Sequence, residues 1–281
     1  MKRTRSIGSF GLAAFLAIAL AGTALAASTV NLGSAKSFAV LAGTTITNTG
    51  ATTITGDVGV HPGKAATGFT TVTLHGAKHL GDAVALSAQN SLVTAYNDAA
   101  GATPVTKVAT ELGGTTLKAG VYGSDTLGLT GTLTLDGAGV YIFQAGSTLI
   151  TAPNSTVALI NGASACNVYW QVGSSATLDT STSFKGTILA LTSIALKTGA
   201  TLQGRALARN GAVTLDHNTI NSSSCAAPSS TAGATAPATD TLGSPSAAGT
   251  DRSAETLLLV IAAVAFVGAL RFAFGRSRSR D

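Results

Sequence analysis

Residues 168–220 read VYWQVGSSATLDTSTSFKGTILALTSIALKTGATLQGRALARNGAVTLDHNTI, and this stretch decides the fold. It repeats one phrase: a small polar residue, an aliphatic residue, another small polar residue and then a glycine-marked corner. Leu178, Leu196 and Leu215 hold the same place in successive copies, 18 and 19 residues apart. Leu149 marks an earlier copy, 29 residues before Leu178, so an insertion around Cys166 separates those two copies. Fixed periods of this size indicate stacked structural repeats.

Each copy divides into three short segments with alternating polar and apolar residues, bounded by Gly, Asn, Ser or Pro. This pattern is typical of β-strands. One copy consists of GTILAL (186–191), SIALK (193–197) and ATLQG (200–204). Three strands and three corners predict one triangular coil of a β-solenoid, with coils about 4.7–4.9 Å apart.

Two earlier segments extend this architecture. In residues 37–60, Phe38–Leu41, Thr44–Thr47 and Thr52–Thr55 repeat the three strand segments and predict a further coil. In residues 76–100 the apolar residues change to helical spacing, namely Leu80, Val84, Ala85, Ala88, Leu92, Ala95 and Tyr96. We therefore expect one long amphipathic α-helix that buries this stripe along the side of the coils.

The N-terminus predicts secretion. Residues 1–26 combine a basic start, an apolar run and the A-x-A sequence Ala24-Leu25-Ala26, so we expect a signal peptide followed by a mature domain over 27–221. The net charge of +5 comes largely from the two ends, and only 10% of residues are charged. The positive charge is therefore a signal of membrane topology, and we expect no nucleic-acid partner.

The C-terminus predicts a membrane anchor. Residues 222–253 are rich in Ser, Ala, Thr, Pro and Gly, which predicts a disordered linker. Within 254–275, Thr256–Phe274 is apolar apart from Arg271 and long enough for a transmembrane helix. The basic residues 276–281 should stay cytoplasmic, which places the domain on the extracellular face of the cell membrane. No LPxTG-type motif precedes the span, so attachment to a cell wall is the less favoured alternative.

The chain has two cysteines, Cys166 and Cys225. In a secreted chain two cysteines favour one disulfide over two free thiols. Neither lies in a CxxC pair or near a set of further ligands, so we expect no metal site.

Three separated motifs carry a family resemblance. They are the opening Val30-Asn31-Leu32-Gly33 with residues 37–60, the helix end AYNDAAG (95–101) and residues 168–220. Together they resemble the microbial ice-binding protein family, also called DUF3494 or the type 1 ice-binding domain. The resemblance implies a right-handed, discontinuous β-solenoid, in which the N-terminal coil stacks out of chain order and an α-helix packs alongside. It also implies an ice-binding function and a secreted or surface location.

The sequence offers little for catalysis. His75 and His79 are spaced for one helix face, but Gly76 stands where zinc proteases have a glutamate, so we interpret them as a solvated helix start. Asp216 and His217 are neighbours, and on a strand they would point to opposite faces. No nucleophile elbow, phosphate loop or carboxylate pair is present in the sequence. We expect neither an enzyme nor a cofactor nor a small-molecule substrate.

The third strand of each coil carries the candidate site. Residues that precede an inward aliphatic residue should point outward, and in six coils they bear a hydroxyl group. A threonine presents a methyl and a hydroxyl on a stiff β-branched side chain, which suits a flat rigid surface. Thr-A/G-x-Thr/Asn motifs at two corners match the family's ice-binding motif. The candidate ice-binding residues are Thr53, Thr55, Thr132, Thr134, Thr151, Asn154, Thr156, Ser183, Thr198, Thr201 and Thr219.

Two alternatives remain open at this stage. Threonine is a good strand former, so the exposed threonines could be structural, and the chain could be an adhesive surface protein on the same scaffold. The second strands are less suited to a flat surface, because Asp179, Lys197 and Asp216 should point outward. Tyr169 and Trp170 are the aromatic candidates for glycan adhesion, and we expect the helix to cover them. The favoured hypothesis is a monomer whose partners are ice and the lipid bilayer.

Overall fold

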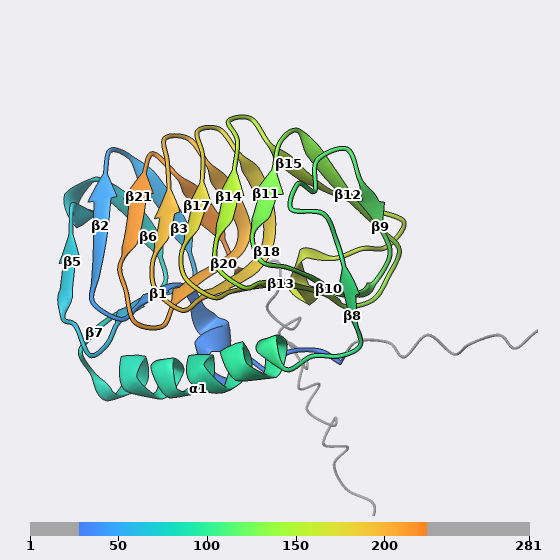
Figure 1. The fold of residues 1–281 in the computed structure, drawn as a ribbon. Helices are drawn as coiled ribbons and strands as arrows, with labels where there is room; N and C mark the ends of the chain where they lie inside the picture. Colours follow the sequence, from blue (N-terminus) through green and yellow to red (C-terminus); the bar gives the residue numbers. More distant parts are fainter. Residues whose placement is uncertain (1–27, 224–281) are drawn as a thin grey trace, which may run out of the picture. The chain divides into compact units, whose positions relative to one another are not determined.

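The computed structural model describes residues 28–223, which form a β-solenoid with one α-helix alongside (Figure 1). The predicted signal peptide, most of the linker, the transmembrane helix and the basic tail lie outside the described residues, as does Cys225. Within the described range, no helix is both long enough and apolar enough to cross a bilayer.

The first face of the solenoid, face a, lies beneath the helix. All its strands pair in parallel. In spatial order they are β8 (Val105–Lys107), β10 (Gly120–Ser124), β13 (Tyr141–Ala145), β16 (Val168–Val172), the second halves of β18 (Ser183–Ala190) and β20 (Thr201–Ala208), β1 (Phe38–Ala42), β4 (Asp57–Val60) and β7 (Lys78–Leu80).

The second face, face b, is a separate seven-stranded parallel sheet. In Figure 1 its strands stand side by side across the front of the solenoid. In spatial order they are β11 (Leu127–Leu129), β14 (Leu149–Thr151), β17 (Ala176–Leu178), β19 (Ile194–Leu196), β21 (Val213–Asp216), β2 (Thr45–Thr49) and β5 (Ala65–Thr67).

The third face, face c, is joined to face a because β18 and β20 run through both faces. At the bend Gly204 has φ 149°, and a Cβ there would lie 1.9 Å from the carbonyl oxygen of Gly186, so only glycine fits. The strands of face c are β9 (Thr116–Leu117), β12 (Thr132–Asp136), β15 (Thr156–Ile160), the first halves of β18 and β20, β22 (Thr219–Asn221), β3 (Thr52–Thr55) and β6 (Val72–His75).

The coils do not stack in chain order. The N-terminal coil packs on the C-terminal one through the pairs Val40↔Ala206, Ile46↔Val213 and Thr53↔Thr219. In Figure 1 the blue strand β2 therefore lies next to the orange strand β21. This discontinuity was implied by the family resemblance and by no feature of the repeat. The structure also contains a further N-terminal coil of β4, β5 and β6, which the sequence analysis missed because the 3-10 helix Phe69–Thr71 interrupts the strand pattern.

The α-helix, α1 (Ala83–Ala100), is capped by Asp82, whose Oδ1 accepts a hydrogen bond from the Ala85 N–H at 2.8 Å. The predicted apolar stripe is largely confirmed, but two of its members are wrong. Leu80 lies in β7, and the side chain of Val84 is 48% exposed. The helix begins only at Ala83, so the stripe begins at Ala85 and is completed by Gln89, which donates to the Ala208 carbonyl at 3.2 Å.

Two hydrophobic cores hold these layers together. The outer core joins α1 to face a, where Leu92 of the helix packs with Ile142, Leu189 and their neighbours. The 3-10 helix Gly33–Ser37 contributes Ala35 to this core. The inner core fills the solenoid and includes a stack of four aromatic rings, with centroids 4.1–5.5 Å apart, formed by Tyr122, Phe143, Trp170 and Phe184. Apart from its end strands β8 and β7, face a is therefore buried on both sides, which leaves faces b and c open to solvent.

Candidate functional site

The predicted hydroxyl column on face c forms as one row across neighbouring strands. Strand pairing places each predicted member opposite the next, and no member is fully buried. The row also contains Thr73, which the sequence analysis missed because the extra N-terminal coil was not recognised. In spatial order the hydroxyl column is Thr132, Thr156, Ser183, Thr201, Thr219, Thr53 and Thr73.

The pairing under this column is uneven. Strands β12 and β15 pair over five residues, whereas β15 and β18 pair only at Thr156↔Ser183. The seven hydroxyls are thus continuous in order, but between the second and the third of them the strand pairing is reduced to a single residue pair.

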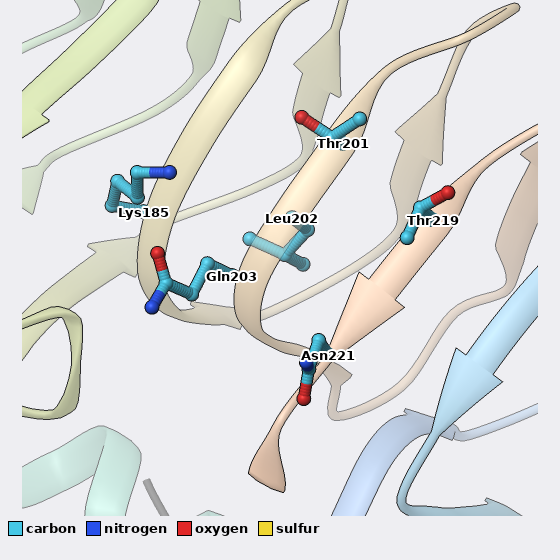
Figure 2. Close-up of a pocket in the computed structure, with 6 residues that line it drawn as sticks. All are labelled: Lys185, Thr201, Leu202, Gln203, Thr219 and Asn221. Atoms are coloured by element: carbon cyan, nitrogen blue, oxygen red, sulfur yellow. The ribbon is translucent and has the colours of Figure 1, made fainter. Parts of the chain in front are cut away.

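The second outward column of face c is polar and partly hollow. Lys185, Gln203 and Asn221 occupy neighbouring positions on β18, β20 and β22. They line a hollow of about 220 Å3 together with Thr201, Thr219 and Leu202 (Figure 2). Thr55 and Thr134, both predicted site residues, lie half-buried in the same column outside the hollow, and Thr55 is the strand neighbour of its lining residue Asn221. Face c is therefore neither flat nor free of charge.

The corner motifs divide between surface and core. Asn154 and Thr198 are exposed at corners between faces b and c. The prediction that Thr151 faces outward is wrong, because its side chain is 1% exposed. It pairs with the inward Leu129, and its Oγ1 lies 2.8 Å from Thr182 Oγ1 and accepts a hydrogen bond from the Asp179 N–H at 2.8 Å. A threonine at this inward position replaces a leucine of other coils and satisfies the polar groups of the turn.

Face b presents a regular column of small side chains. The strand register aligns one central outward position across all seven strands, with no irregularity. Every side chain in this column is uncharged and ends in a methyl group, a hydroxyl group or, for glycine, a hydrogen. In spatial order the face-b column is Gly128, Ile150, Thr177, Ala195, Thr214, Thr47 and Thr67. Ile150 is 53% exposed, so this face also offers apolar surface to water.

The charges expected to disrupt face b lie at its edge. Asp179 and Lys197 fall just beyond the ends of β17 and β19, and Asp216 is the last residue of β21. Asp179 and Lys197 form an ion pair of 3.2 Å. Asp216 accepts hydrogen bonds from the Thr198 hydroxyl and from the ring of His217. These three charges therefore lie at the corner and not in the central column. At the β11 end of the column, Glu111 pairs with Gly128 in an isolated bridge, so one carboxylate borders the column there.

The same hydrogen bonds keep these two carboxylates ionised. A backbone hydrogen bond from Thr180 is the main cause that lowers the pKa of Asp179, and Lys197 adds to it. The Thr198 hydroxyl and then His217 lower the pKa of Asp216. The corner thus holds its charge at neutral pH in contacts that join neighbouring coils.

The histidines lie elsewhere than the sequence suggested. His217 has φ 51°, which takes it out of the strand, so its Nδ1 lies 2.6 Å from Asp216 Oδ1 and the two residues do interact. His75 ends β6 and His79 lies in β7, so the two do not share a helix. His79 contacts Asp82, the N-cap of α1, at 2.8 Å. The contacts of His217 with Asp216 and of His79 with the helix N-cap Asp82 therefore have a structural explanation.

The aromatic candidates are buried on opposite sides of face a. Tyr169 faces α1 and belongs to the outer core, as expected. Trp170 points into the solenoid, where its Nε1–H donates to the Lys185 carbonyl at 2.9 Å, so the helix does not cover it. Adjacent strand residues alternate between faces, which separates the pair. Neither ring is available for glycan stacking.

Cys166 is disulfide-bonded in the structure and lies in the 3-10 helix Ala165–Asn167. Cys225 lies outside the described residues, so its pairing with Cys166 stays a prediction. Mass spectrometry of the mature chain without reductant should find two hydrogens fewer than in the dithiol, and the bond should add about 2–4 kcal/mol of stability. Two alkylatable thiols in the secreted protein would contradict this pairing.

Comparison with known proteins finds relatives that are described as ice-binding proteins. Residues 40–221 match the family described as Ice-binding-like. The chain is 50% identical over 205 residues to an ice-binding protein of Nostoc sp. (strain HG1), covering 70% of this chain and 76% of that one. It is 37% identical over 222 residues to an ice-binding protein of Colwellia sp., covering 72% and 87%.

Solved structures agree in fold. The crystal structure of an ice binding protein from an Antarctic biological consortium superposes with a TM-score of 0.68 at 48% identity, covering 69% of this chain and 91% of that one. The DUF3494 domain of Shewanella frigidimarina ice-binding protein 1 gives 0.65 at 31% identity, covering 70% and 98%.

Proposed function

Because the chain belongs to the ice-binding-like family, we propose that it binds ice through a flat face of its solenoid. Parallel pairing repeats outward side chains at strand spacing, about 4.7–4.9 Å. Methyl groups on such a surface order adjacent water, and hydroxyl groups hold that water in place. Strand-borne threonines lose little side-chain entropy on contact, so a rigid face suits a rigid solid. This function requires no catalytic group or cofactor, and we expect it of a monomer.

Face b is the binding surface that we favour. The observation that carries this choice is the column of seven uncharged residues in unbroken register, of which Ile150 is the one large member. A bound crystal plane must contact many coils at once, so a regular sheet contributes more than an interrupted one. A charged side chain in the contact area would also have to give up its hydration without gaining a partner.

The hydroxyl column of face c is the second candidate surface. It is favoured by its chemistry, because all seven members bear hydroxyl groups. Its neighbour column, with Lys185 and the hollow, speaks against close contact with a flat solid. The exposed corner residues Asn154 and Thr198 adjoin both faces and would lie at the rim of either surface.

The direct test of the function uses the purified chain in a sub-freezing droplet. We expect it to shape growing ice crystals, to separate the freezing and melting points, and to slow ice recrystallisation. If the folded protein produces none of these effects, ice binding is rejected and the alternative, a structural or adhesive surface protein, takes its place.

We further propose that the domain is displayed outside the cell on a membrane anchor. The support is the apolar segment Thr256–Phe274 followed by basic residues. In its native cell the full chain should fractionate with membranes, whereas a chain that ends at Ser253 should be released. Full-length protein found free in the medium would contradict the anchor.

A further inference from the structure

The hollow on face c has the composition of a binding site and no role in the proposed contact between face b and ice. Its rim consists of side chains from three neighbouring strands, Lys185 of β18, Gln203 of β20 and Asn221 of β22 (Figure 2). Leu202, which is 1% exposed, forms the floor, and Thr201 and Thr219 line the far side. Strand pairing fixes the backbone of each of these residues, so their side chains start from set positions around the hollow.

The ammonium group of Lys185 is the only charge in the lining. Within residues 28–223, Lys118 and Lys197 form ion pairs with Asp136 and Asp179, whereas the Lys185 side chain has no ion pair or hydrogen bond. Lys185 is half-buried as a residue, and its ammonium group, which has no carboxylate partner, retains three free donors. The hollow therefore attracts an anionic group.

The two carboxamides add directed hydrogen-bonding groups. Asn221 Oδ1 accepts hydrogen bonds from the Ser223 N–H at 2.9 Å and from the Ser223 hydroxyl at 2.6 Å, so its amino group is the end left for a ligand. The side-chain amide of Gln203 has no hydrogen-bond partner among residues 28–223 and can both donate and accept. The Thr219 hydroxyl also has no hydrogen-bond partner among residues 28–223 and can do the same. Gln203 and Asn221 thus extend the site from the Lys185 ammonium group across the next two strands.

We propose that this hollow binds a uronate unit, the carboxylate-bearing sugar of acidic polysaccharides. The carboxylate would accept charge-assisted hydrogen bonds from Lys185, and the ring hydroxyl groups would bind the amides of Gln203 and Asn221. A phosphate would use the cation but would leave the side-chain carbonyl oxygen of Gln203 without a donor to bind. The volume of about 220 Å3 is smaller than a drug-sized pocket and fits one monosaccharide-sized group. The hollow is open to solvent, so the neighbouring units of a polymer could continue along the face.

The proposal is tested with full-length protein in neutral detergent, by affinity electrophoresis through gels that contain polygalacturonate. We expect retardation in this gel and none in a gel that contains dextran, a neutral polymer. Lys185→Gln should weaken the apparent affinity about tenfold, which corresponds to about 1.4 kcal/mol. The double variant Gln203→Ala with Asn221→Ala retains the charge and should also lose affinity.

The matched control is Lys107→Gln, which removes the same charge from an exposed lysine of β8. It should stay within about twofold of the parent, because an exposed charge contributes little to binding at a distant site. Equal losses in Lys185→Gln and Lys107→Gln would show non-specific attraction and overturn the site. Free galacturonate should compete with the polymer, and equal competition by acetate would overturn the assignment to a sugar. Thermal melting confirms that each variant is folded, and none of these measurements depends on ice binding.

Discussion

Replacing Thr214 with tyrosine should nearly abolish ice shaping and freezing-point hysteresis. Thr214 is exposed in the face-b column between Ala195 and Thr47. A tyrosine ring there would stand above the small side chains of its neighbours and hold the whole column away from a crystal plane. The fold should survive, because a surface substitution that leaves no cavity costs within about 0.5 kcal/mol. Nanolitre osmometry measures the hysteresis, and thermal melting measures the stability.

The matched control is Thr201→Tyr, which introduces the same ring at an exposed position of the hydroxyl column on face c. We expect this variant to retain most of the activity. If Thr201→Tyr loses activity and Thr214→Tyr keeps it, the binding surface is the hydroxyl column that the sequence predicted. Equal and small losses in both variants would show that neither face is the site.

Replacing Trp170 with alanine should cause the largest loss of stability among the changes considered. Trp170 is the centre of the aromatic stack, with ring centroids 4.1 Å from Phe143 and 4.8 Å from Phe184. Its removal leaves a cavity between coils and takes the hydrogen-bond donor from the Lys185 carbonyl. We expect a loss of about 3–5 kcal/mol in the free energy of unfolding, measured by urea denaturation.

Trp170→Phe is the control for this change, since it keeps an aromatic ring in the stack and loses the N–H donor. It should cost clearly less than Trp170→Ala, because most of the volume and ring contact remain. A small loss in the alanine variant would mean that the coils close around the cavity and that the stack is not a main source of stability.

The repeat was predictable because each coil places its inward residues at a regular spacing along the sequence. Inward positions such as Leu178, Leu196 and Leu215 recur once per coil, and the alternation of sides on a strand sets the outward positions between them. Six of the seven residues of the hydroxyl column could therefore be predicted, and Thr73 could not, because its coil was not recognised. The stripe of α1 was predictable for the same reason, since helical periodicity is local.

The errors arose where one residue's environment depends on distant chain segments. Thr151 has the sequence of a surface motif, yet its strand register places it inside the solenoid against the next coil. The extra N-terminal coil escaped notice because its strands are short and are stabilised mainly by pairing with β1, β2 and β3.

The sequence by itself determined the coil, its triangular repeat, the helix and the small uncharged outward residues, because each of these follows from spacing along the chain. Only the tertiary structure decided that the N-terminal coil stacks on the C-terminal one, since that pairing joins residues such as Val40 and Ala206 that no periodicity relates. It also decided which face is regular. The charged residues Asp179, Lys197 and Asp216 lie at a corner, and Lys185 borders a hollow. These placements depend on where each strand ends and on how neighbouring coils stack, and the sequence pattern does not give either.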